Sequence, residues 1–212
     1  MDAQLRPRLR GVFHQYAFFV SIGFGALLIS GASGASERAS AIVFAAALAA
    51  MFGVSALYHR LTWQPRARRL MRRLDHTAIY LLIAATYTPF VLLALSGAWR
   101  WTLLPIVWGG ALAAIVFKLA WVDAPKWLDA AIGMSLGWIG IVGLPPLWAH
   151  SGPTGVGLLA LGGVLYTVGA VIYAGRRPDP APAVFGYHEL FHLFVIAAAA
   201  CQYAAVALFV LD

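Results

Sequence analysis

Long apolar segments separated by short polar connectors follow one another along the whole chain. Most segments have about 20 residues, the length at which an α-helix crosses the hydrocarbon core of a bilayer. The pattern predicts seven spans, at residues 11–30, 39–59, 74–95, 100–121, 128–148, 154–174 and 187–211. We therefore expect an all-α fold, an integral membrane seven-helix bundle that forms a single domain over residues 1–212.

The composition excludes a water-soluble protein. Hydrophobic residues make up 62% of the chain and charged residues only 11%, far from the averages of soluble domains. The apolar run after residues 1–10 lacks a small-residue cleavage site, so we expect a retained first span and not a signal peptide. Cys201 lies alone inside an apolar run, which indicates a small buried side chain and no disulfide framework.

Basic residues are concentrated in every second connector. With a cytoplasmic amino terminus, 13 of the 15 Lys and Arg residues lie on that side, and only Arg38 and Arg100 lie on the other. The positive-inside rule then predicts a cytoplasmic amino terminus and an outer carboxyl terminus. This topology explains the formal charge of +7, so nucleic acid is not an expected partner.

Histidines gather at the cytoplasmic ends of the predicted spans. His188 and His192 stand four residues apart, so a helix projects both imidazoles from one face. His59 ends the second span at a similar depth. Three imidazoles leave a fourth position for water, which is the arrangement of a catalytic zinc site. We therefore predict that His59, His188 and His192 bind Zn2+.

Two polar residues near these histidines are candidates for catalysis. Asp75 opens the third span and would orient a zinc-bound water or accept its proton. Ser55, one turn before His59, would hold the water or a substrate carbonyl. For Asp75 the alternative is structural, as an N-cap that pairs with Arg72 or Arg73.

Three further polar residues stay outside the predicted site. His14 and His76 are expected at the membrane interface or as supports of the ligands. Gln202 either lines a cavity or makes an interhelical hydrogen bond, and we favour the hydrogen bond.

Residues 188–192 read HELFH and match the H-E-x-x-H pattern of zinc proteases, in which the glutamate acts as base. Glu189, however, is rotated by about 100° from His188 around the helix. No further His, Glu or nearby Asp follows His192 as a third ligand. A membrane metalloprotease is therefore a minor alternative.

Three segments resemble signature motifs of the hemolysin III family. SALYH (55–59), LDHTAIYLLIAATYTPF (74–90) and FGYHELFHLFV (185–195) occur in the order and in the spans typical of that family, and RGVFH (10–14) extends the similarity over nearly the whole chain. This family is the bacterial branch of the progestin and adipoQ receptor group (PAQR), which is distantly similar to alkaline ceramidases. The resemblance implies seven membrane helices with the amino terminus inside.

The resemblance also implies functional residues. Zinc would be held by His59, His188 and His192, with Asp75 and Ser55 in contact with it through water. Receptor members of the group are thought to hydrolyse ceramide-like lipid amides. The chain departs from the pattern in two places: residues 47–54 carry no carboxylate ahead of Ser55, and Ala85 stands where many relatives have glycine.

These observations lead to two main functional hypotheses. The first is a zinc-dependent hydrolase of lipid amide or ester bonds, ceramidase-like, with membrane lipids as partners. The alternative is a non-enzymatic sensor or homeostasis protein of the bacterial inner membrane in which zinc is structural. A cytolytic pore of the hemolysin type is less well supported, because no span carries the repeating polar stripe of a water-filled channel.

Overall fold

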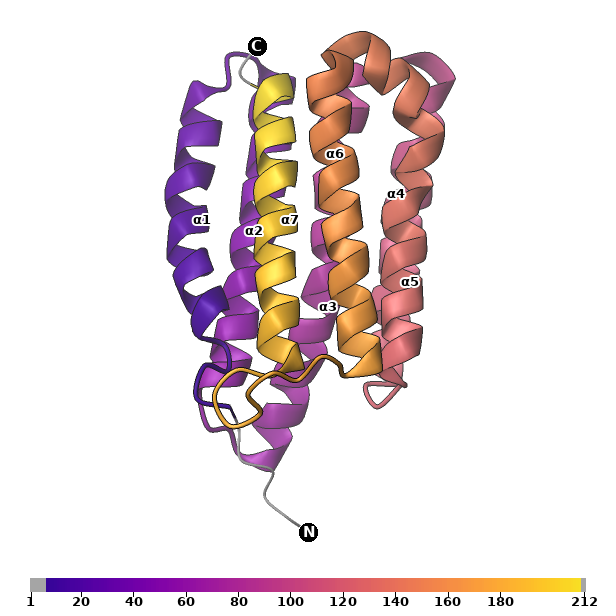
Figure 1. Ribbon diagram of the computed structural model, residues 1–212. Coiled ribbons are helices and arrows are strands. Elements are labelled where there is room, and N and C mark those ends of the chain that lie inside the picture. Colours follow the sequence, from indigo (N-terminus) through magenta and orange to yellow (C-terminus); the bar gives the residue numbers. More distant parts are fainter. Residues whose placement is uncertain (1–6, 211–212) are drawn as a thin grey trace.

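The computed structural model describes residues 7–210, which are almost entirely helical. One isolated bridge, between Ala181 and Phe185, is the only β-type pairing within that range. The helices run alongside one another as a bundle (Figure 1). They are α1 (Val12–Gly31), α2 (Ala35–Arg60), α3 (Pro65–Pro89), the π-helix η1 (Phe90–Ala94), α4 (Gly97–Ala120), α5 (Lys126–Trp138), the 3-10 helix η2 (Ile139–Gly143), α6 (Leu144–Gly175) and α7 (Tyr187–Val210).

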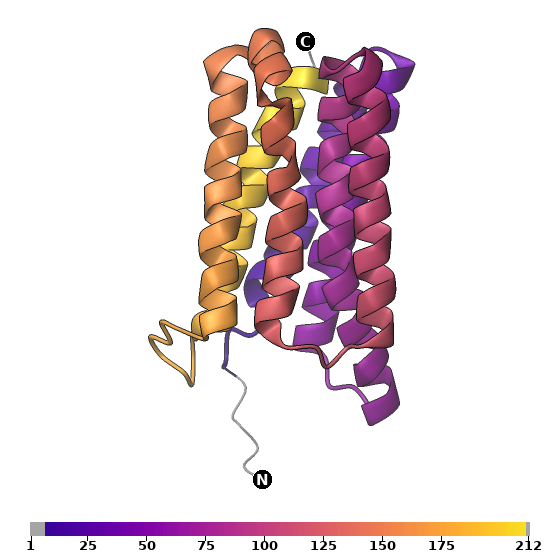
Figure 2. The same ribbon diagram turned by 90° about the vertical axis from the view of Figure 1, so that its right-hand side faces the viewer.

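Six continuous helical segments within the described residues are long and apolar enough to cross a membrane. The fifth of them, Lys126–Gly175, contains α5, η2 and α6. It folds back on itself, so that α5 and α6 lie side by side (Figures 1 and 2). The all-α, membrane-spanning class expected from the sequence is therefore confirmed.

A 3-10 turn at η2 and a break at Gly152 interrupt this segment. At η2, the hydroxyl of Tyr87 on α3 accepts a hydrogen bond of 2.7 Å from the backbone N–H of Gly140 and donates one to the carbonyl of Gly137. These bonds satisfy backbone groups that become free where α5 ends. Gly152 (φ 62, ψ -164) then breaks the helical path near the start of α6. The predicted span over residues 128–148 is therefore helical along its length, with the 3-10 turn η2 inside it, and the reversal at Gly152 lies in the connector predicted before residue 154.

The basic stretch before Asp75 is helix and not connector. The sequence pattern places the start of the third span at residue 74, but α3 begins at Pro65. Proline is favoured in the first turn of a helix, and the following Arg, Leu and Met residues are strong helix formers. Hydropathy detects only the apolar part of such a helix, so the polar extension was missed.

Helices α2 and α3 occupy the interior of the bundle. They have the largest buried share among the six spanning segments. Phe44, Leu48 and Phe52 of α2 pack with Val91 of η1 and Val206 of α7 in the main apolar core. Large apolar side chains on the outside, such as Phe19 and Leu112, remain exposed, as suits surfaces that face lipid.

The two ends of the bundle differ in charge. We call the end where α2 stops and α7 begins the basic end; it carries residues 61–64, 121–125 and 176–186 as connectors. At the far end, Arg38 donates a hydrogen bond of 3.2 Å to the carbonyl of Ala32. Arg100 donates to the carbonyls of Leu92 (2.7 Å) and Leu95 (3.0 Å). Both arginines therefore bind carbonyls where a helix ends.

Candidate metal site

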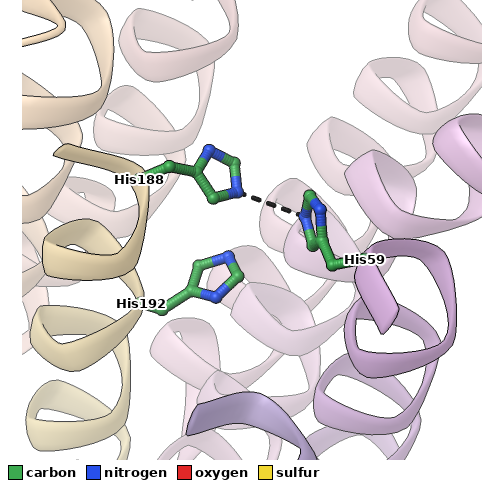
Figure 3. Close-up of side chains that lie close together, drawn as sticks. All are labelled: His59, His188 and His192. Atoms are coloured by element: carbon green, nitrogen blue, oxygen red, sulfur yellow. Dashed lines mark hydrogen bonds between the residues drawn. The ribbon is translucent and has the colours of Figure 1, made fainter. Parts of the chain in front are cut away.

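Three histidines from two helices meet at the basic end of the bundle. His59 lies in the last turn of α2, while His188 and His192 lie one turn apart in the first turns of α7. One ligand nitrogen from each histidine lies within 4.8 Å of the other two. Figure 3 shows the imidazoles of His188 and His192 pointing toward that of His59. The predicted convergence of these three side chains is thus present.

The spacing within this cluster suits a shared cation. The Nε2 atoms of His59 and His188 are 3.1 Å apart. Two nitrogens on a tetrahedral zinc, with Zn–N distances of 2.0–2.1 Å, stand about 3.3 Å apart. His188 and His192 are buried and His59 is partly buried, so the three imidazoles meet largely away from water. The cluster is therefore close enough to bind a metal ion.

Asp75 and Ser55 lie beside the histidine cluster. An Asp75 carboxylate oxygen is 3.7 Å from Nε2 of His59 and 3.6 Å from Nδ1 of His76. Ser55, one turn deeper on α2, is buried, and its Oγ lies 2.8 Å from Nδ1 of His14. Helices α2 and α3 thus bring a carboxylate and a hydroxyl to the place where the imidazoles meet.

An internal cavity of about 280 Å³ extends from this cluster toward the far end. His192, Asp75 and Ser55 line it at the basic end, and Leu95 and Leu147 line it at the far end. Most of the remaining lining is apolar. The polar groups therefore occupy one end of a long apolar chamber.

A short amino-terminal segment covers the cluster. The backbone N–H groups of Arg8 and Leu9 donate hydrogen bonds of 3.1 Å to the carbonyls of Ala183 and Val184. Gly11 follows with φ +77, and a Cβ built on it would lie 2.6 Å from Cβ of His59. Only glycine fits this close approach, so the segment is packed directly on a metal-ligand candidate.

Comparison with known proteins gives a family. The family model described as "Haemolysin-III related" matches residues 3–203, almost the whole chain. The chain belongs to the hemolysin III family. Its histidine cluster, Asp75 and Ser55 all lie inside the matched region.

Bacterial and mammalian relatives share this similarity. The chain is 35% identical over 164 residues to the Hemolysin-3 homolog of Bacillus subtilis (strain 168), covering 77% of this chain and 74% of that protein. It is 36% identical over 177 residues to Hemolysin-3 of Bacillus cereus, with 84% and 78% covered. The human Monocyte to macrophage differentiation factor is 27% identical over 203 residues, with 91% and 79% covered. With its apolar helices, this hemolysin III chain is a multi-pass integral membrane protein of bacterial type.

Asp75 lies inside helix α3 and not at its start. Helix α3 starts at Pro65 and its N-cap is Gln64, so the interpretation of Asp75 as an N-cap is wrong. Arg72 pairs instead with Asp123 at 2.7 Å. Asp75 lines the cavity and faces His59.

The glutamate of the HELFH segment has a structural partner. Glu189 is fully buried, lies 2.6 Å from Nε of Arg10 and accepts a hydrogen bond of 2.8 Å from the backbone N–H of Gly186. The carboxylate thus anchors the amino-terminal segment and the connector before α7. This pairing gives no support to Glu189 as the base of a protease.

His14 makes more contacts with the site residues than the sequence pattern indicates. Its ring is buried and stacks in parallel on His192, with centroids 3.7 Å apart and an interplanar angle of 7°. It links α1 to Ser55 on α2 and to His192 on α7. His76, in contrast, donates from Nδ1 to the carbonyl of Arg72 on its own helix, at 2.8 Å. Both stay outside the ligand cluster, as expected.

Gln202 combines both of its proposed roles. Its Nε2 donates a hydrogen bond of 3.3 Å to the carbonyl of Leu159, which confirms the expected link between α7 and α6. The same side chain also lines the cavity.

Proposed function

We propose that this chain is a zinc-dependent hydrolase that cleaves an amide or ester bond of a membrane lipid. The observation that carries the proposal is the meeting of three imidazoles with Asp75 and Ser55 at the polar end of an apolar cavity. This arrangement combines ligands for a metal, a proton acceptor and room for an acyl chain.

His59, His188 and His192 would hold the ion and leave a further coordination position open. When bound there, zinc supplies Lewis-acid chemistry, which polarises a carbonyl and makes water nucleophilic near neutral pH. The parallel stacking of His14 on His192 supports the orientation of this ligand.

Asp75, Ser55 and the apolar cavity would carry out proton transfer, positioning of the reacting groups and binding of the lipid chain. Asp75 accepts a proton from the attacking water as the new C–O bond forms, and this proton passes to the leaving amine or alcohol when the C–N or C–O bond breaks. Ser55 holds the substrate carbonyl or the water, with its hydroxyl oriented by His14 at 2.8 Å. The apolar part of the cavity takes the lipid chain and excludes water from it.

We further propose that the chain is a single domain over residues 1–212 that crosses the membrane seven times. The hairpin of α5 and α6 provides two of these crossings. The concentration of Lys and Arg at the basic end supports a cytoplasmic amino terminus, which puts the histidine cluster near the cytoplasmic face of the inner membrane and the carboxyl terminus outside.

The test of this proposal is metal-dependent lipid turnover. Purified protein in nanodiscs is incubated with ceramide and with a phospholipid panel, and the released fatty acid is measured. We expect release by the zinc-loaded protein, loss of release after chelation and recovery after zinc is added. Equal release with and without chelation, or no release by zinc-loaded protein from any lipid, would contradict the proposal.

Replacement of Gly11 by alanine is expected to lower the affinity for zinc by about 10- to 100-fold, the usual effect of disturbing a support of a ligand. The added Cβ would lie 2.6 Å from Cβ of His59, and the φ of +77 adds a backbone penalty of roughly 1–2 kcal/mol. His59 must therefore move. Zinc titration against a competing chelator measures the change.

Gly23→Ala is the matched control for Gly11→Ala. Gly23 lies in α1, the helix that Gly11 precedes, and a Cβ at this position would meet nothing within 4 Å. Its zinc affinity should equal that of the wild type. Equal affinities in the two variants would show that the contact between Gly11 and His59 has no influence on the site.

A further inference from the structure

A second charged pair lies at the basic end, apart from the histidine cluster. Lys118 in the last turn of α4 donates hydrogen bonds of 2.8 and 2.7 Å to the two carboxylate oxygens of Asp129 in the first turn of α5. The side chains are 0% and 10% exposed, respectively. This is an ion pair almost completely withdrawn from water.

Stability alone explains the presence of this buried ion pair only in part. A cation at the end of α4 and an anion at the start of α5 both suit the helix dipoles, and their contact joins the two helices. However, a buried ion pair is commonly no more stabilising than apolar residues of similar volume. Charged groups within a membrane protein are therefore candidates for a function.

The two partners differ in their access to the cavity. Asp129 lines it, whereas Lys118 lies behind Asp129 and outside the lining. Each oxygen of Asp129 accepts one bond from Lys118 and keeps a further lone pair for another donor. Lys118 thus fixes the carboxylate in place and leaves it able to bind a ligand.

Carboxylates are the charged side chains in the cavity lining. Asp75 and Asp129 both line it, and no Lys or Arg does so among the residues that the structure describes. Arg72, the basic residue nearby on α3, is bound to Asp123 at 2.7 Å. Hydroxyl and amino groups of a ligand would therefore find carboxylate acceptors in this lining.

We propose that Asp129, held by Lys118, is a specificity-determining residue that binds a hydrogen-bond donor on the polar end of the lipid substrate. This inference rests on the proposed function, in which the cavity holds that lipid. It identifies the substrate class as a lipid whose headgroup carries hydroxyl or amino groups.

Binding of three probes with the same alkyl chain tests the proposal. Dodecylglycerol ether, dodecylamine and dodecyl phosphate present a hydroxyl, an ammonium and a phosphate group, and none contains a bond for the enzyme to hydrolyse. Their dissociation constants are measured with zinc-loaded, full-length protein in nanodiscs. The selectivity is the ratio of the Kd for the phosphate to the Kd for each of the other two probes. We expect loss of Asp129 to lower this ratio by at least about 10-fold, as one charge-assisted hydrogen bond would give.

The decisive variant exchanges the two charges, Lys118→Asp with Asp129→Lys. A merely structural pair survives this exchange and leaves the selectivity unchanged, which would overturn the proposal. If Asp129 binds the headgroup, the exchanged protein presents a cation to the cavity, and its selectivity shifts toward dodecyl phosphate by at least about 10-fold relative to the wild type. Coordination of phosphate by zinc is common to both proteins and cancels in the comparison.

Two further variants complete the test. If the exchanged protein does not fold, Lys118→Met with Asp129→Asn takes its place in the test. This variant removes both charges and should lower the selectivity between the probes, by less than the charge exchange would. Asp123→Asn removes a carboxylate that is 72% exposed and outside the cavity lining, so wild-type selectivity is expected. Because the probes report binding alone, a protein that hydrolyses no lipid but shows this selectivity would refute only the proposed function. If the wild type hydrolyses lipid but the exchanged protein keeps the wild-type selectivity, only the role of Asp129 is refuted.

Discussion

Replacement of Asp75 by asparagine is expected to reduce lipid turnover by about 100- to 10,000-fold, the range typical for loss of a general acid or base. Asparagine has nearly the same size but cannot accept the proton of the attacking water. Its contacts with the histidines are long, 3.7 Å to His59 and 3.6 Å to His76, so the ligands should keep their positions. Bound zinc should therefore remain at the wild-type level, and fatty-acid release measures the loss.

The outcome for Asp75→Asn separates the two functional hypotheses. A hydrolase loses turnover and keeps zinc. If the metal only joins α2 to α7 and the protein acts as a non-enzymatic sensor or homeostasis protein, the physiological phenotype is intact in this variant. Asp123→Asn, which removes an exposed carboxylate at the same end of the bundle, is the control and should behave as the wild type.

Replacement of His59 by alanine is expected to lower bound zinc from about one ion per chain to less than about one tenth, because two imidazoles remain where three are needed. Turnover should disappear with the metal. The melting temperature should also fall, since a ligand at 100 times its Kd stabilises a protein by about 2.7 kcal/mol. Metal analysis of the purified protein and thermal unfolding with and without zinc measure these effects.

His150→Ala provides the comparison for His59→Ala. His150 stacks on Phe209, with ring centroids 5.2 Å apart, and does not belong to the histidine cluster. Its removal should leave the zinc content at the wild-type level. Equal zinc content in the two variants would mean that the metal is not bound through His59.

Much of the fold could be predicted from the apolar pattern alone, and the errors have physical causes. The starts of α1 and α7 were placed within one residue, because charge and glycine mark the change from connector to apolar run. The start of α3 was missed because its first residues are polar yet strongly helix-forming. The 3-10 turn η2 inside the fifth predicted span is contacted by Tyr87, which is distant in the sequence, so no local signal could indicate it.

The parts of the candidate site that could be predicted are those that depend on spacing within one helix or on depth in the membrane. His188 and His192 follow from their spacing, and His59 follows from its position at the end of a span. The contact of His14 with Ser55 depends on how α1 packs against α2, which hydropathy does not specify. The same holds for Glu189, whose pairing with Arg10 joins residues from opposite ends of the sequence.

The contacts of the two arginines at the far end affect how the numbers of basic residues at the two ends are interpreted. Since Arg38 and Arg100 bind the carbonyls that α1, η1 and the residue after it leave without partners, their positive charge is met by the negative ends of those helices. In the folded protein they act as local counter-charges to these helix ends. The difference in charge between the two ends of the bundle is therefore larger than the numbers of basic residues imply.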